Sequence, residues 1–376
     1  MTTKSIVSPE DQKVTFVELF FDLVFVFSVT QVVGLFHDDL NLITVGKAIL
    51  VFWLVWWAWT QFTWALNAAD TTHPLIQLGV LVATGIAFFM AVALPQAFGD
   101  QSIWFGVTYV LVRVLGLALY IWVASADPAQ RKAVQTFALV SVGGLAAVLI
   151  GALFGGTLQL WLWGLAIALD IGAAAIGGQL EGWNLHPEHF SERHGLFVII
   201  ALGESLIVAA GGFAISIGIS GILTIAFLAV AITGALWWSY FPKTKPLLDE
   251  AIESGHGAEQ VRLARDVFSL IHFPMVCGIV AYAVAIEEVV AHPNDPLSLA
   301  GRAALAIGIL LFVGGMAVAV YQATNQVLLP RILLVLVAVV LIVALSGIGA
   351  ALTLGIALGC MILVLINEQP TIRPSH

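Results

Sequence analysis

Long apolar runs, separated by short groups of polar residues, are the main pattern along this chain. Runs of about 20 residues, long enough to cross the ~30 Å hydrocarbon core of a bilayer as helices, recur almost from end to end. Counted between Gly, Pro and charged breaks, they predict twelve spans, at about residues 14–36, 43–65, 75–94, 102–124, 133–154, 158–178, 195–214, 218–239, 266–290, 300–321, 331–346 and 350–366.

The last two spans depend on a break at residues 346–349, which read Ser-Gly-Ile-Gly. Without that break, residues 331–366 would form one helix of about 54 Å, too long for a single crossing. We therefore predict two spans here. The alternative is eleven spans, with the tail outside.

Composition supports a membrane protein. The chain has 60% hydrophobic residues, 10% charged residues and a mean hydropathy of +1.02, which excludes an ordinary soluble domain. A β-barrel would show alternating apolar and polar residues, whereas these runs are continuous. We predict an all-α fold, a polytopic helix bundle whose partner is the lipid bilayer. A net charge of -9, with basic residues dispersed, gives no sign of nucleic-acid binding.

The basic residues predict the orientation. With twelve spans and a cytoplasmic N-terminus, the outside loops hold only Lys47 and Arg302. The inside segments hold Lys4, Lys13, Arg131, Lys132, Arg193, Lys243, Lys245, Arg262, Arg265, Arg331 and Arg373. This is the positive-inside pattern, so we expect both termini in the cytoplasm.

Segment 179–194 divides the spans into six and six. We expect a first membrane half at residues 1–178, a cytoplasmic connector at 179–194, and a second half at 195–376. A parallel duplication is allowed because six crossings return the chain to its starting side.

Four ionisable residues, Asp22, Arg113, Asp170 and Glu204, lie deep inside predicted spans. Such residues are costly in hydrocarbon and normally face a cavity and pair there, so they are the leading candidates for a functional site. Arg113 stays protonated and needs an anionic partner. Asp22, Asp170 and Glu204 are the candidates. The pairing could be a substrate or proton switch, or a permanent structural ion pair.

Glu18 and Asp22 are four residues apart and therefore share one helix face. In a low dielectric they cannot both stay ionised cheaply, so one should hold a proton or find a cation. For Glu18 the simpler alternative is a hydrated position at the end of the helix. We expect Glu192 and Arg193 at the membrane interface, where charges are readily hydrated.

His272 precedes Pro274 at the start of the predicted ninth span. Imidazole titrates near neutral pH, so His272 could relay protons, although a single interfacial His is more often structural. The chain has no His-Glu-x-x-His pair, Gly-x-Ser-x-Gly elbow, Walker lysine loop or Gly-x-Gly-x-x-Gly fingerprint. We therefore predict no metal site and no cofactor, and we favour a non-enzymatic role.

Several stretches resemble the bacterial low temperature requirement protein A family. They are ELFFDLVFVF at 18–27, WWAW at 56–59 with Trp64 and Asp70, ERHGLF at 192–197 continuing to GES at 203–205, and HFP at 272–274 with GIV at 278–280. Where the family tends to have Arg-Phe-Gly, this chain reads Arg193-His194-Gly195. The resemblance implies a multi-spanning protein of the bacterial inner membrane. It does not indicate a substrate.

Taken together, these features predict a proton-coupled secondary transporter of a small solute. Asp22 or Glu204 would carry the proton, Arg113 would pair with charge or capture an anion, and Asp170, Glu18 and His272 would complete the site. Phe21, Phe25, Trp56 and Trp57 would stack or gate. An ion channel, an intramembrane enzyme or a sensor could use the same buried charges.

Overall fold

The computed structural model of the chain describes residues 5–9, 12–37, 40–178, 182–215 and 221–367. Within these ranges the regular elements are helices, and the only pairing of β type is two isolated bridges, Val7 with Ala69 and Pro296 with Gly349. The all-α prediction is confirmed. Lys4, Arg373, the predicted start of the eighth span and the first residues of the predicted connector lie outside the described residues.

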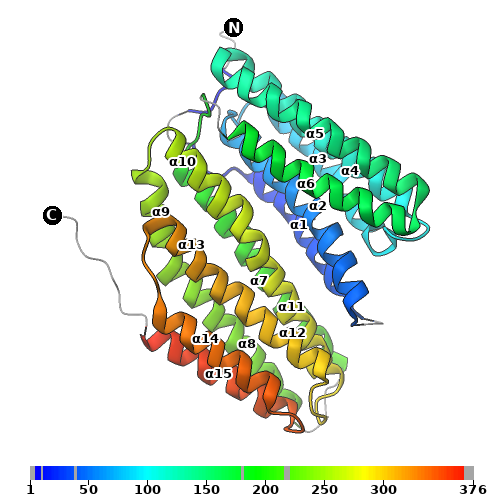
Figure 1. Ribbon diagram of the computed structural model, residues 1–376, viewed down its shortest axis with the longest axis vertical. Coiled ribbons are helices and arrows are strands. Elements are labelled where there is room, and N and C mark those ends of the chain that lie inside the picture. Colours follow the sequence, from blue (N-terminus) through cyan, green and yellow to red (C-terminus); the bar gives the residue numbers. More distant parts are fainter. Residues whose placement is uncertain (1–4, 10–11, 38–39, 179–181, 216–220, 368–376) are drawn as a thin grey trace, which may run out of the picture. The chain divides into compact units, whose positions relative to one another are not determined.

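The helices follow one another with short connections (Figure 1). The first group is α1 (Phe16–Gly34), α2 (Leu42–Asn67), α3 (Pro74–Ala93), η1 (Leu94–Gln96), α4 (Ser102–Val123), η2 (Ala124–Ala126), α5 (Pro128–Phe154), α6 (Gly156–Gly177) and α7 (Pro187–Ile215). The second group is α8 (Ile222–Trp238), η3 (Ser239–Thr244), α9 (Lys245–Ser254), α10 (Ala258–Leu263), η4 (Ala264–Ile271), α11 (His272–Ala291), α12 (Leu299–Ile309), η5 (Leu310–Gly314), α13 (Gly315–Thr324), α14 (Leu329–Ala344) and α15 (Ala350–Asn367). Elements η3, η4 and η5 are π-helical turns that continue the neighbouring α-helices.

Eleven helical stretches in the described ranges are long and apolar enough to cross a membrane. A twelfth apolar helix, α14, is shorter, with 16 residues. Helix α14 ends at Ala344 and α15 begins at Ala350, so the predicted break at 346–349 is present. The prediction of a polytopic helical membrane bundle is confirmed.

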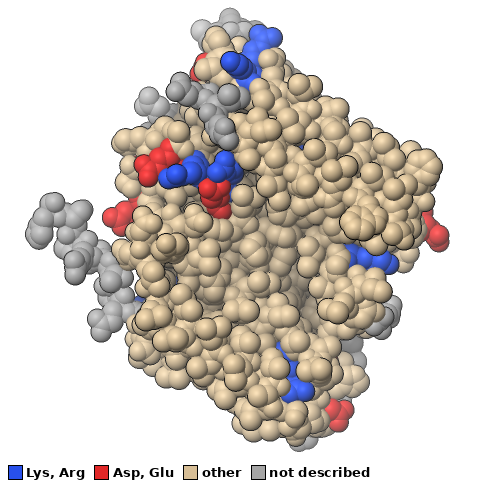
Figure 2. Space-filling view, viewed as in Figure 1, with Lys and Arg blue, Asp and Glu red and all other residues tan. Residues whose placement is uncertain are grey.

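The outer faces of the helices are apolar. Phe89, Trp161 and Phe227 have exposed fractions of 63%, 75% and 70%. In water such a surface would aggregate, whereas in a bilayer these side chains contact lipid tails. On the face shown in Figure 2, charged side chains form a few small groups separated by wide areas without charge.

The chain forms two compact units, and each is described by itself. Unit 1 contains residues 1–197 and 252–269, and unit 2 contains residues 198–251 and 270–376. In unit 1, α5 packs on α6, α3 on α4, and α1 and α2 on this group. In unit 2, α11 packs on α12, and α15 on α8 and α14.

Glycine permits the closest helix approaches in both units. A Cβ at Gly116 of α4 would lie 2.8 Å from the side chains of Gln61 and Phe62 on α2. In unit 2, a Cβ at Gly278 of α11 would lie 2.7 Å from the backbone nitrogen of Phe312 and 2.8 Å from the carbonyl oxygen of Gly308. Small residues at such crossings let backbones approach each other, which is how membrane helices gain packing energy.

Candidate functional site

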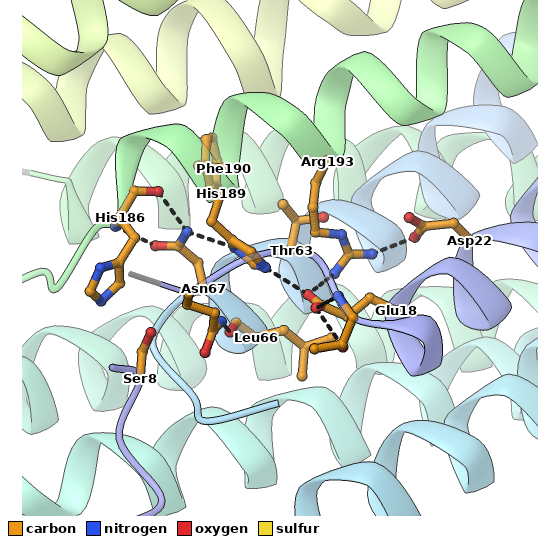
Figure 3. Close-up of polar contacts among 12 residues, drawn as sticks. Ser8, Glu18, Asp22, Thr63, Leu66, Asn67, His186, His189, Phe190 and Arg193 are labelled. Atoms are coloured by element: carbon orange, nitrogen blue, oxygen red, sulfur yellow. Dashed lines mark hydrogen bonds and ion pairs between the residues drawn. The ribbon is translucent and has the colours of Figure 1, made fainter. Parts of the chain in front are cut away.

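Unit 1 contains a buried polar cluster formed by the starts of α1 and α7 and the end of α2 (Figure 3). Glu18 and Asp22 are four residues apart on α1, and His189 and Arg193 are four residues apart on α7. Since residues at this spacing share a helix face, two acids on one helix meet two basic groups on the other. We call Glu18, Asp22, His189 and Arg193 the acid–base cluster.

Glu18 is fully buried and both of its carboxylate oxygens are bonded. One oxygen, Oε2, accepts hydrogen bonds from the backbone N–H and the hydroxyl of Thr15, at 2.9 and 2.8 Å. This is the return half of a capping box at the start of α1. The other oxygen, Oε1, lies 3.0 Å from Nε2 of His189 and 3.2 Å from Nη1 of Arg193. Glu18 therefore both starts its helix and binds α7.

Asp22 lies one turn further along α1 and is also fully buried. Its Oδ1 accepts a hydrogen bond from the indole N–H of Trp59, at 2.8 Å, and another from Nη2 of Arg193. Its Oδ2 has no hydrogen-bond partner among the residues that the structure describes. A buried carboxylate oxygen without a donor is unfavourable when ionised and is a natural place for a proton.

Asn67 fixes the protonation of His189. The backbone N–H of His186 donates to Oδ1 of Asn67 at 2.8 Å, so the amide nitrogen of Asn67 faces the other way. That nitrogen donates to the carbonyl of His186 at 2.9 Å and lies 3.1 Å from Nδ1 of His189. Nδ1 must then accept, which leaves the proton on Nε2, the nitrogen that lies 3.0 Å from Oε1 of Glu18. In this arrangement His189 is neutral.

The charges of the acid–base cluster do not balance. With His189 neutral, two carboxylates face a single permanent cation, the guanidinium of Arg193, which also lies 5.7 Å from the centre of the Trp59 ring. One proton on Asp22 would make the cluster neutral. Since a net buried charge is strongly unfavourable, the cluster is suited to binding and releasing one proton.

A second buried ion pair in unit 1 joins α4 to α6. Nη2 of Arg113 lies 3.1 Å from Oδ1 of Asp170, and Nη1 donates to Oδ2 at 3.4 Å. Nη1 also donates to the hydroxyl of Tyr109 at 2.6 Å, and Nε donates to Oε1 of Gln61. The amide of Gln61 donates in turn to the carbonyl of Arg113 at 2.8 Å. One cation faces one anion here, so this pair is electrically balanced.

The structure therefore selects Asp170 as the partner of Arg113 among the three acids considered from the sequence. Asp22 and Glu18 pair with Arg193 instead. Glu204, on the part of α7 that belongs to unit 2, is buried with an exposed fraction of 1%. His272 is also in unit 2, where its Nε2 lies 2.9 Å from the hydroxyl of Tyr240.

Two expectations about exposure are wrong. Arg193 does not lie in the hydrated interface but is fully buried against α1, because Glu18 and Asp22 compensate its charge there. The simpler alternative for Glu18, a hydrated helix end, fails for the same reason, since Glu18 has no exposed surface.

The aromatic candidates surround this region of unit 1. Phe21 packs against Phe25 and Phe62 with tilted rings, whose centres are 4.8 and 4.7 Å apart. The indole N–H of Trp56 donates to the carbonyl of Ser269 at 2.8 Å, and Trp57 lines a separate cavity. Among the residues described, no three His, Cys, Asp or Glu side chains form a group that could hold a metal ion.

Comparison with known proteins supports the family resemblance. The model of the family described as bacterial low temperature requirement A protein (LtrA) matches residues 13–366. An uncharacterised protein of Rhizobium meliloti (strain 1021) is 28% identical over 316 residues, which cover 81% of this chain and 76% of that protein. Because the family match covers most of the sequence, the chain belongs to the LtrA family.

Proposed function

We propose that this LtrA protein is a proton-coupled secondary transporter of a small solute, and that Asp22 is its proton carrier. Membership of the family and the apolar helices make it an integral membrane protein. The choice of Asp22 as proton carrier is supported by one observation. The acid–base cluster holds two carboxylates and one permanent cation, and the carboxylate oxygen that lacks a donor belongs to Asp22.

A proton on Asp22 changes how strongly α1 and α7 attract each other. When Asp22 is ionised, Arg193 is shared between two acids. When Asp22 is neutral, Arg193 is left with Glu18 in a balanced pair. Because Glu18 and Asp22 of α1 both bind Arg193 of α7, protonation of Asp22 can bias two arrangements of the helices, as coupled transport requires.

The balanced Arg113–Asp170 pair has a different role in this proposal. Its donors are bonded to Asp170, Tyr109 and Gln61, so it holds α4, α6 and α2 together. Glu204 and His272 of unit 2 remain candidates for a second proton position, since both are buried.

The test is proton flux in proteoliposomes that contain the purified protein and an internal pH-sensitive dye. A panel of sugars, amino acids, organic acids and aromatic solutes is added outside, and the internal pH is followed. We expect at least one solute to change it with the wild-type protein and none with Asp22→Asn.

Asp127→Asn is the matched control. Asp127 is exposed and caps α5 by accepting from the backbone N–H of Ala129, which an Asn oxygen can also do. This variant should behave as wild type. If correctly folded wild-type protein gives no solute-dependent pH change, or if Asp22→Asn keeps the full response, the proposal is wrong. Single-channel currents in planar bilayers would show that the protein is an ion channel and not a secondary transporter.

A further inference from the structure

Unit 2 contains a large groove between α11, η5, α13 and α14. The centres of water-sized molecules can occupy about 600 Å³ of it. This volume lies within the ~300–1,000 Å³ that is usual for ligand sites in proteins. The groove is therefore large enough to hold a bound molecule.

The lining of the groove is almost entirely apolar. Of the described lining residues, only Tyr321 has a polar side chain, and none is charged. Water in such a groove would find almost no hydrogen-bond partners, and an empty groove would lose van der Waals contacts along its walls. In a membrane, both costs are avoided when a hydrocarbon chain fills the space.

The floor of the groove is open because it lacks large side chains. Gly314 and Gly315, at the junction of η5 and α13, line the groove together with Ala317. A Cβ at Gly314 would meet only the side chain of Leu310, at 3.7 Å, so no side chain of a neighbouring helix fills this space. The η5 turn itself is π-helical, a rare geometry that occurs often at functional sites.

The groove follows the helices over about half the thickness of a membrane. Its lining extends from Leu328, just before α14, to Leu336, which is about 12 Å at the helical rise. Along η5 and α13 it extends from Leu310 to Tyr321, about 16 Å. Half of the ~30 Å hydrocarbon core is about 15 Å. The groove therefore has the length of one lipid leaflet.

One end of the groove lies at the membrane interface and the other end lies near the midplane. Tyr321 and Val327 are next to the turn between α13 and α14, where one apolar helix ends and the next begins. Leu336 is in the middle of α14, and Leu310 is in the middle of the 26-residue span Leu299–Thr324. A tyrosine at the first end is typical of the aromatic belt at the interface. A lipid with its headgroup at this turn would place its chain along the groove.

The rim of the groove continues the apolar outer surface of the helices. Val318, Tyr321 and Val327 have exposed fractions of 50%, 51% and 61%. A lipid chain can therefore enter from the bilayer. A transmembrane helix of a protein partner fits less well, because it is ~10–12 Å wide and crosses both leaflets.

The helices that form the groove do not repel a phosphate group. Residues 296–367, which include η5, α13 and α14, contain no Asp or Glu. A phosphate at the turn between α13 and α14 therefore meets no negative side chain of these helices. This favours a phospholipid over a cationic amphiphile.

We propose that this groove is a binding site for one acyl chain of a membrane phospholipid, whose headgroup lies at the turn between α13 and α14. A chain in the groove contacts protein on several sides, whereas a chain elsewhere on the surface contacts it on one side. The proposal concerns binding and does not rest on the transport proposed above.

The experiment uses purified protein in dodecyl maltoside and a phosphatidylglycerol that carries a diazirine halfway along one acyl chain. After brief irradiation, the labelled residues are identified by mass spectrometry. Val318 and Leu336 of the groove should be labelled at least about fivefold more than Val337 and Val340, which are at least as exposed but lie outside it. Excess unlabelled phosphatidylglycerol should remove the labelling of the groove.

Equal labelling of the two pairs of residues would overturn the proposal, as would groove labelling that unlabelled lipid does not reduce. A dimeric protein whose groove is not labelled would assign the groove to a second copy of the chain and would also overturn it. Labelling is read without any gradient, so failure of transport leaves this result unaffected.

Gly314→Leu and Gly359→Leu are a matched pair of variants. Both glycines are helical and an added Cβ meets no neighbouring helix at either, but Gly314 lines the groove and Gly359 is exposed on α15. Leu at 314 should fill part of the groove and lower the labelling of Val318 and Leu336 at least about fivefold, whereas Leu at 359 should leave it unchanged. Unchanged labelling in folded Gly314→Leu would refute the proposal. If that variant fails to fold, the labelling pattern of the wild type and its competition by unlabelled lipid decide the question.

Discussion

Replacing Arg193 by Met and Asp22 by Asn should affect stability very differently. Arg193→Met removes the cation that serves both Glu18 and Asp22 and that lies 5.7 Å from the ring centre of Trp59. Breaking a buried ion pair from one side costs about 3–5 kcal/mol, and the lost cation–π contact adds about 1 kcal/mol. We expect the free energy of unfolding to fall by about 4–6 kcal/mol.

Asp22→Asn should cost less than about 2 kcal/mol. The amide oxygen of Asn can take the place of Oδ1 and accept from both Trp59 and Arg193. Its NH2 group then occupies the place of Oδ2, which has no partner in the described structure, so no hydrogen bond is lost. The weaker attraction to Arg193 is offset because one buried charge fewer must be desolvated.

The measurement is unfolding by sodium dodecyl sulfate titration in mixed micelles, followed by near-ultraviolet circular dichroism of the tryptophans. The triple variant Glu18→Gln, Asp22→Asn, Arg193→Met contains no uncompensated charge and should regain at least about 2 kcal/mol relative to Arg193→Met. Equal losses for Asp22→Asn and Arg193→Met, or a triple variant no more stable than Arg193→Met, would refute the assignment of two acids and one cation to the acid–base cluster.

Three further predictions use the same titration or a related measurement. Asp170→Asn should lower the free energy of unfolding by about 3–5 kcal/mol, more than Asp22→Asn does, because it leaves Arg113 buried without an acid. A loss below about 1 kcal/mol would contradict this. Gly278→Ala should lower the free energy of unfolding by about 1–3 kcal/mol, because its Cβ would clash with backbone atoms of the neighbouring helix. Gly355→Ala is the control: its Cβ would meet nothing within 4 Å, so its free energy of unfolding should stay within about 0.5 kcal/mol of wild type. Asn67→Ala removes the bonds that hold the start of α7, so amide hydrogen exchange in residues 188–193 should accelerate at least about tenfold, and unchanged exchange would refute that role.

The spans could be predicted from the sequence because run length and the cost of unpaired backbone groups in lipid determine them. The break before α15 followed from the excessive length of a single helix, and the structure has it between Ala344 and Ala350. The predicted start of the seventh span at residue 195 is eight residues later than the start of α7 at Pro187. The polar residues 188–194 resembled a loop, although several are buried against other helices of unit 1.

The pairing of buried charges could not be predicted fully from the sequence. Hydropathy gives the depth of Asp22, Asp170 and Glu204 but not their direction around the bundle, so Arg113 had three possible partners. A signal for the acid–base cluster was present: acids at 18 and 22 and basic groups at 189 and 193 have the same four-residue spacing. The contributions of Asn67, Trp59 and Gln61 depend on helix contacts that no local pattern encodes.

Unit 1 is discontinuous in the sequence, and this has a consequence for how the protein is made. Its last segment, residues 252–269, follows a stretch of unit 2, and Ser269 receives the hydrogen bonds of Trp56 and Trp64. During synthesis, unit 1 therefore cannot complete these contacts until residue 269 has left the ribosome. Residues 198–251 of unit 2 have been made by then, so completion of the first unit follows synthesis of the first part of the second.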